Sequence, residues 1–159
     1  MKFVILSAMG LSLFAVLLQD LKFRKIHVAL LPVIFFSGVL LSHDYLTKQS
    51  LIINLVFFCL TFIIMYLYIV LKEQRLLNPF QRHFGLGDFL FYLSVTPIFE
   101  PKDYIMYFVG SLIFCLITMK IFSNDKHNNS IPLAGLASLF LIIILLIEQF
   151  SNNFNMTAI

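Results

Sequence analysis

Charged residues are scarce in this sequence. Lys and Arg together number 11 and Asp and Glu number 8 among 159 residues, which is 12% of the chain, whereas 60% is hydrophobic. Soluble domains carry about 25% charged residues, so a water-soluble fold could not cover this much apolar surface. The composition predicts an all-α protein embedded in a lipid bilayer. The small net charge of +3 argues against a nucleic-acid partner.

Cysteine is also rare. Cys59 and Cys115 both fall inside apolar segments and form no Cys-x-x-Cys pair, which argues against a disulfide framework or a metal site. The sequence lacks the His-Glu-x-x-His motif of zinc proteases and the Gly-x-Ser-x-Gly motif of serine hydrolases. We therefore expect no metal and no cofactor.

Long apolar runs account for most of the chain. A helix needs about 20 apolar residues to span a bilayer, with a range of about 17–25. About six runs approach this length, and they predict transmembrane helices at 3–19, 28–41, 51–71, 84–99, 104–122 and 132–150. The connections are short, so residues 1–150 are expected to form a single membrane-embedded domain, followed by a short polar C-terminal tail at 151–159. No small-residue cleavage site follows the first run, which indicates a retained span rather than a signal peptide.

The distribution of basic residues predicts the orientation in the membrane. Most of the Lys and Arg residues fall in the first, third and fifth loops, namely Lys22, Arg24, Lys25, Lys72, Arg75, Arg82, Lys120 and Lys126. By the positive-inside rule, these three loops face the cytosol and both termini face outside.

Two acidic residues differ from the others, most of which sit among polar loop residues. Asp20 and Asp88 each lie where a predicted span meets a cytosolic loop, so they share one membrane face. A carboxylate slightly within the membrane is costly and suggests a function. As an alternative, Asp88 could be only the N-cap of the helix that follows Gly85 and Gly87. Asp20 is harder to explain in this way, because the helix dipole disfavours negative charge near the C-terminal end of a span.

A close pair of carboxylates has a specific chemistry. The two groups cannot both ionise easily, so they share a proton. The ionised member can take a proton from water while the protonated member polarises a peptide carbonyl, which hydrolyses an amide without a metal. Gly85 and Gly87 lack a Cβ and would let another backbone approach the acid closely.

Two motifs resemble those of the prepilin peptidases, a family of GxGD membrane aspartyl peptidases. Residues 85–88 (GLGD) are a GxGD motif, and residues 20–26 (DLKFRKI) are similar to the family's D-[LI]-[RK]-x-R-x-I stretch. Residues 131–135 (IPLAG) resemble the small-residue segment with proline that often opens the family's last span. The resemblance implies a GxGD aspartyl protease-like fold over nearly the whole chain, with Asp20 and Asp88 as the catalytic pair.

The resemblance also implies a reaction and a location. The substrate would be the N-terminal leader of a pilin-like precursor protein, cut at the cytosolic face of the bacterial cytoplasmic (inner) membrane. The paired Cys-x-x-Cys sequences of the family's methylating region are not found here, so we expect no N-methyltransferase activity. His27-Val28 replaces the family's usual Pro-Asn, and Phe89-Leu90 replaces a Lys-containing stretch, which bears on substrate preference.

Other roles remain open at this stage. Arg24 and Lys25 could hold the substrate or only set the topology, and His27 and His83 could tune the site or only lie at the interface. A small proton or cation transporter component, with the two aspartates binding the ion, is one alternative function. A noncatalytic assembly or scaffold protein with a peptidase-like fold is another. The sequence does not predict the oligomeric state.

Overall fold

The computed structural model describes residues 2–42, 46–73, 85–122 and 132–156. Within these residues the chain is helical and contains no strand, which confirms the predicted all-α class. The helices are α1 (Lys2–Phe23), α2 (Leu30–Leu41), α3 (Lys48–Glu73), α5 (Leu86–Val95), α6 (Pro101–Phe122) and α7 (Leu133–Met156).

Three of these helices are long and apolar enough to cross a membrane. The qualifying stretches are Phe3–Phe23 in α1, Lys48–Lys72 in α3 and Pro101–Ile121 in α6. The other apolar stretches are shorter, namely Leu30–Leu41 in α2, Leu86–Val95 in α5 and Leu133–Gln149 in α7. Large apolar side chains lie on the surface, among them Leu71 at 78% and Ile121 at 70% exposure. Such a surface is compatible with a lipid environment, because lipid tails are themselves apolar.

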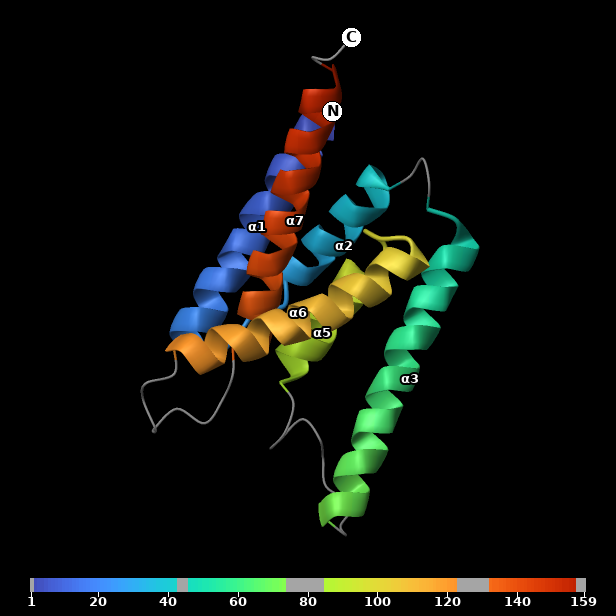
Figure 1. The fold of residues 1–159 in the computed structure, drawn as a ribbon, viewed down its shortest axis with the longest axis vertical. Coiled ribbons are helices and arrows are strands. Elements are labelled where there is room, and N and C mark those ends of the chain that lie inside the picture. Colours follow the sequence, from blue (N-terminus) through green and yellow to red (C-terminus); the bar gives the residue numbers. More distant parts are fainter. Residues whose placement is uncertain (1, 43–45, 74–84, 123–131, 157–159) are drawn as a thin grey trace.

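The helices form one bundle with a less closely packed side. α1 and α7 run side by side, and the start of α1 lies at the same end of the fold as the end of α7 (Figure 1). α1 also packs against α2, α2 against α5, and α6 against α7. α3 stands on the side away from α1 and α7, where it contacts α5 and α6 (Figure 1).

Helix periodicity explains which residues enter the core. Met9 and Leu13 lie one turn apart on α1 and are fully buried. Ala134, Ala137 and Leu141 form the matching buried face of α7. Alanine is small, so it lets two helices pack closely where no water drives them together. The close pairing of α1 with α7 is seen at Gly135, where an added Cβ would lie 3.4 Å from the backbone oxygen of Leu17 on α1.

The fourth helix is shorter than the sequence predicted. A span was expected over residues 84–99, but α5 covers only the 10 residues Leu86–Val95. This is about 15 Å of helix, roughly half of a hydrocarbon core of about 30 Å. The helix ends because Pro97 has no backbone N–H to continue it, and the N–H of Thr96 turns back to the carbonyl of Leu93.

Polar side chains of α3 and of the end of α2 donate hydrogen bonds to the backbone carbonyls that follow the end of α5. Asn54 on α3 donates from Nδ2 to the carbonyl oxygens of Thr96 at 2.9 Å and Phe99 at 2.8 Å. The hydroxyl of Ser42, at the end of α2, donates to the carbonyl oxygen of Pro97 at 2.7 Å. Carbonyls in an apolar interior are costly without a donor. The fold therefore compensates for the break in α5 through tertiary hydrogen bonds.

Two other helices, α1 and α7, end four or more residues beyond the predicted spans. α1 continues past residue 19 to Phe23, so Asp20 lies in its last helical turn. It stops where Arg24 adopts a φ of 53°, a left-handed conformation that ends helices. α7 continues to Met156, whereas the predicted span ended at residue 150. Extending an existing helix needs no new nucleus, and polar residues can therefore continue it.

Candidate functional site

Asp20 and Asp88 meet at the first turn of α7. Asp20 comes from the last turn of α1 and Asp88 from the first turn of α5. The N–H of Gly135 donates to Oδ2 of Asp20 at 2.6 Å, and the N–H of Ala134 donates to Oδ1 of Asp88 at 2.8 Å. The two carboxylates thus bind adjacent amides, which brings together two residues far apart in the sequence.

The start of α7 offers these amides for a physical reason. The first turn of any helix leaves N–H groups without a partner inside the helix. Pro132, which precedes α7, has no polar side chain to accept them. The carboxylates of two other helices take the place of this cap, and the positive end of the α7 dipole favours their negative charge. This environment offsets the unfavourable position of Asp20 at the end of α1.

The alternative that Asp88 only caps its own helix does not account for this geometry. The N-cap of α5 is Gly85, and Asp88 lies within the first turn after it. Its carboxylate reaches across to the amide of Ala134 on α7. Asp88 therefore links α5 to α7, whatever else it contributes to the start of α5.

Glycines make the close approaches around the two aspartates. A Cβ added to Gly85 would lie 2.7 Å from Oδ2 of Asp88. A Cβ added to Gly87 would lie 3.1 Å from Cδ1 of Ile26, which belongs to the turn between α1 and α2. Both distances are shorter than ordinary carbon contacts. The GxGD glycines thus leave room for the Asp88 carboxylate and for the neighbouring turn.

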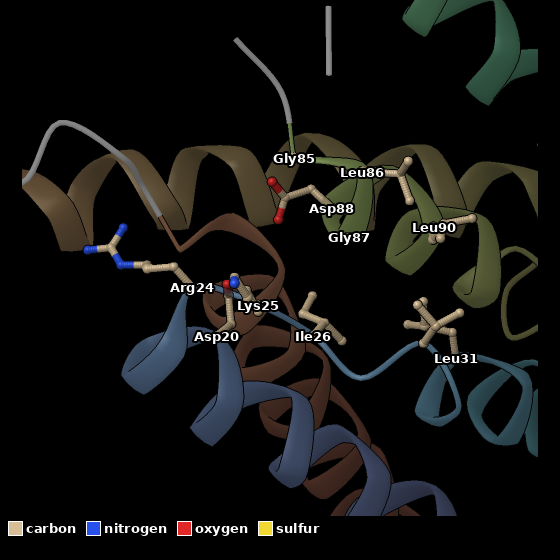
Figure 2. A pocket seen from close by; sticks show the side chains of 11 residues that line it. Asp20, Arg24, Lys25, Ile26, Leu31, Gly85, Leu86, Gly87, Asp88 and Leu90 are labelled. Carbon is tan, nitrogen blue, oxygen red and sulfur yellow. The ribbon is translucent and has the colours of Figure 1, made fainter. Parts of the chain in front are cut away.

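A cavity of about 340 Å³ opens beside the aspartates. This is within the range of about 300–1,000 Å³ that is common for ligand pockets. Charged groups gather at one end of it and apolar side chains at the other (Figure 2). The lining residues are Asp20, Arg24, Lys25, Ile26, Val28, Leu31, Gly85, Leu86, Gly87, Asp88 and Leu90.

The other candidate residues from the sequence differ in whether they line the cavity. Arg24 and Lys25 line the cavity, whereas His27 is exposed and does not line it. The backbone N–H of His27 donates to Oε1 of Gln19 at 2.9 Å, a bond that ties the turn after α1 back to the helix. Gln19 was missed by sequence reasoning, although an amide beside Asp20 in an apolar helix is a usable signal. His83 lies outside the described residues.

Sequence reasoning also missed the amides of Ala134 and Gly135 as a functional feature. Residues 131–135 were noted only for their resemblance to a family segment, because a backbone N–H belongs to every residue except proline. The glycine itself was a usable signal. A Cβ on Gly135 would lie 3.0 Å from both Cβ and Oδ2 of Asp20.

The chemistry open to this site is that of two carboxylates. Among the described residues, no group of three or more His, Cys, Asp or Glu side chains is arranged to hold a metal ion. Two carboxylates held beside each other can share one proton and act together as acid and base. Each has a second oxygen in addition to the one bound by α7. Asp20 is only 6% exposed, so any reacting group must approach it from the cavity.

Comparison of the sequence with protein families and curated proteins, and of the fold with solved structures, found no match.

Proposed function

We propose that this protein is a membrane aspartyl endopeptidase that removes the N-terminal leader of pilin-like precursor proteins. The observation that carries the proposal is the meeting of Asp20 and Asp88 on adjacent amides of α7, beside one cavity. Two carboxylates held in this way can act as acid and base and hydrolyse an amide without a metal. The proposed substrate class is inferred from the resemblance of the motifs that contain them to those of the prepilin peptidases.

We propose further that the chain crosses the membrane about six times, with the short α2 and α5 crossing together with the residues that flank them. Both termini would lie outside, and the aspartates would lie at the cytosolic face of a bacterial cytoplasmic membrane. α1, α3 and α6 would run toward the cytosol in this arrangement. Each of them has a basic residue in its last turn, namely Lys22, Lys72 and Lys120. The positive-inside rule favours this orientation.

The proposed reaction uses one shared proton. The ionised carboxylate of the pair takes a proton from a water molecule, whose oxygen attacks the carbonyl carbon of the scissile peptide bond. The protonated carboxylate gives its proton to the carbonyl oxygen, and a tetrahedral intermediate forms. The carboxyl group that took the proton of water gives it to the peptide nitrogen, while the other carboxylate takes a proton from a hydroxyl of the intermediate. The C–N bond breaks, and the new amine leaves. The products are a carboxylic acid and an amine, and the pair again holds one proton.

The cavity suggests how a substrate lies at the site. Its apolar end, with Leu31 and Leu90, suits the start of an apolar helix, and its charged end contains Arg24 and Lys25 (Figure 2). These two basic residues are proposed to contact the substrate segment on the cytosolic side.

One observation favours a second candidate function. The carboxylates of Asp20 and Asp88 both act as caps for α7, and capping alone stabilises a helix bundle. A noncatalytic scaffold protein would need nothing more from them. The two candidates differ in what happens when the carboxylates lose their charge but keep an accepting oxygen.

Co-expression with a panel of pilin-like precursors tests the proposal. Leader removal is followed on a gel for the wild type, Asp20→Asn and Asp88→Asn, with Asp103→Asn as the control because Asp103 is exposed at the start of α6. We expect each dyad substitution to slow cleavage by about 100-fold or more and the control to cleave normally. Cleavage that survives both dyad substitutions contradicts the mechanism. A wild type that cleaves no precursor supports the scaffold.

A further inference from the structure

One face of α6 carries a row of polar side chains in an otherwise apolar helix. Spacings of three and four residues place them on the same side of the helix. All four are buried, with exposures of 2% or less. This row, here called the polar stripe of α6, consists of Tyr104, Tyr107, Ser111 and Cys115.

Two members of the stripe bind α5 at a single residue. The hydroxyl of Tyr104 donates to the backbone oxygen of Tyr92 at 3.1 Å. The hydroxyls of Ser111 and Tyr92 form a hydrogen bond of 2.8 Å. Tyr92 lies one turn after Asp88, on the same face of α5. The stripe therefore holds α5 one turn away from its aspartate.

The other two members bind α7. The hydroxyl of Tyr107 donates to the backbone oxygen of Ala137 at 3.0 Å. The thiol of Cys115 donates to the backbone oxygen of Leu133 at 3.7 Å, a weak sulfur hydrogen bond. Along the chain, these two carbonyls flank the amides that bind the carboxylates. Successive members of the stripe thus alternate between α5, which carries Asp88, and α7, whose amide donates to it.

We propose that the polar stripe of α6 consists of positioning residues, which set α5 against α7 so that Asp88 meets the amide of Ala134. In a bilayer no hydrophobic force fixes the relative height of two helices, so hydrogen bonds and close packing must do so. None of the four side chains lines the cavity. The catalytic part of this inference rests on the proposed peptidase function, while the placement of α7 can be measured without it.

Phenylalanine substitutions can separate positioning from packing. The Tyr107 ring stacks on Phe99 and Phe140 with centroids 5.1 and 6.1 Å apart, and phenylalanine keeps these contacts while losing the hydroxyl. The variants are Tyr107→Phe, Tyr104→Phe and their combination. Tyr68→Phe on α3 is the matched control, because Tyr68 is 63% exposed.

Two measurements on the full-length protein in detergent test the inference. Hydrogen–deuterium exchange of the peptide that contains residues 133–137 reports how firmly the carboxylates hold the start of α7. Cleavage kinetics on a precursor report kcat and KM separately. We expect Tyr107→Phe to raise exchange and to lower kcat, each by about threefold to tenfold, with KM unchanged. The double variant should exceed both single variants, and Tyr68→Phe should match the wild type.

Each outcome decides the inference. Unchanged exchange at the start of α7 in the double variant overturns it, as does unchanged kcat in an active enzyme. If the wild type cleaves no precursor but the variants still show raised exchange at the start of α7, the positioning of α7 is upheld while the proposed function fails. If Tyr107→Phe does not accumulate in the membrane, Ser111→Ala replaces it. The Ser111 hydroxyl bonds to the Tyr92 hydroxyl of α5 and to the Phe108 carbonyl of its own helix, so the contact between helices that is lost is the one to Tyr92. The same loss of kcat is expected.

Discussion

Gly135 lies so close to Asp20 that an added Cβ would meet both Cβ and Oδ2 of the aspartate at 3.0 Å, and the backbone oxygen of Leu17 at 3.4 Å. The Cβ of Asp20 is fixed to its helix and cannot rotate away. The crossing of α1 and α7 at the aspartate pair therefore depends on the absence of a side chain at residue 135.

Replacing this glycine should separate the two helices. Gly135→Ala is expected to lower stability by about 1–3 kcal/mol through overpacking and to abolish cleavage, because Asp20 loses its amide partner. Thermal unfolding in detergent and the leader-cleavage assay measure the two effects. Gly10→Ala on α1 is the control, since an added Cβ there meets nothing within 4 Å. If both alanine variants unfold at the same temperature, the close contact at residue 135 is not important.

Gly87 and Ile26 should be energetically coupled. Gly87→Val adds three carbons facing a side chain whose Cδ1 is already 3.1 Å from the position of the Cβ. We expect slower cleavage because the turn after α1 is pushed away from Asp88. Ile26→Ala removes the obstructing atoms, so the double variant should recover part of the activity, with a coupling of about 1–2 kcal/mol. Purely additive losses in the four-variant cycle would contradict this contact.

Asn54 on α3 should stabilise the fold through its hydrogen bonds to the residues that follow α5. Asn54→Leu keeps the size of the side chain but leaves the carbonyls of Thr96 and Phe99 without this donor. Unfolding should require about 1–3 kcal/mol less. Thr61→Val is the matched control on α3, because the Thr61 hydroxyl bonds to Phe57 of its own helix at 2.8 Å and links no other element. Equal losses in the two variants would count against a tertiary role for Asn54.

Capping and catalysis by Asp20 should respond differently to two substitutions. Asparagine retains an oxygen that can accept the N–H of Gly135, whereas alanine does not. We expect Asp20→Ala to be about 0.5–2 kcal/mol less stable than Asp20→Asn, while both lose cleavage. Unfolding temperatures and the gel assay measure this pair. If Asp20→Asn is as unstable as Asp20→Ala, the charge at the α7 dipole, rather than the hydrogen bond, holds the helices together.

Much of the secondary structure could be predicted from local properties of the sequence. Long apolar runs with few charges predicted helices and a lipid environment, and six helices are present in the described residues. The end of α5 was misjudged, because the apolar run continues past Pro97 to residue 99 while the helix ends at Val95. Whether a helix continues past a proline depends on which neighbours satisfy the freed carbonyls, and here Asn54 and Ser42 do so.

Local sequence properties were enough to predict an all-helical chain and to distinguish Asp20 and Asp88 from the other carboxylates, since apolar runs and isolated charges are properties of adjacent residues. The binding of both acids to the first turn of α7, and the alternation of the polar stripe of α6 between two helices, depend on the tertiary structure. Backbone amides and carbonyls are the same at almost every residue. Which of them acquires a partner depends on where the helices cross, and that is settled by packing over the whole bundle.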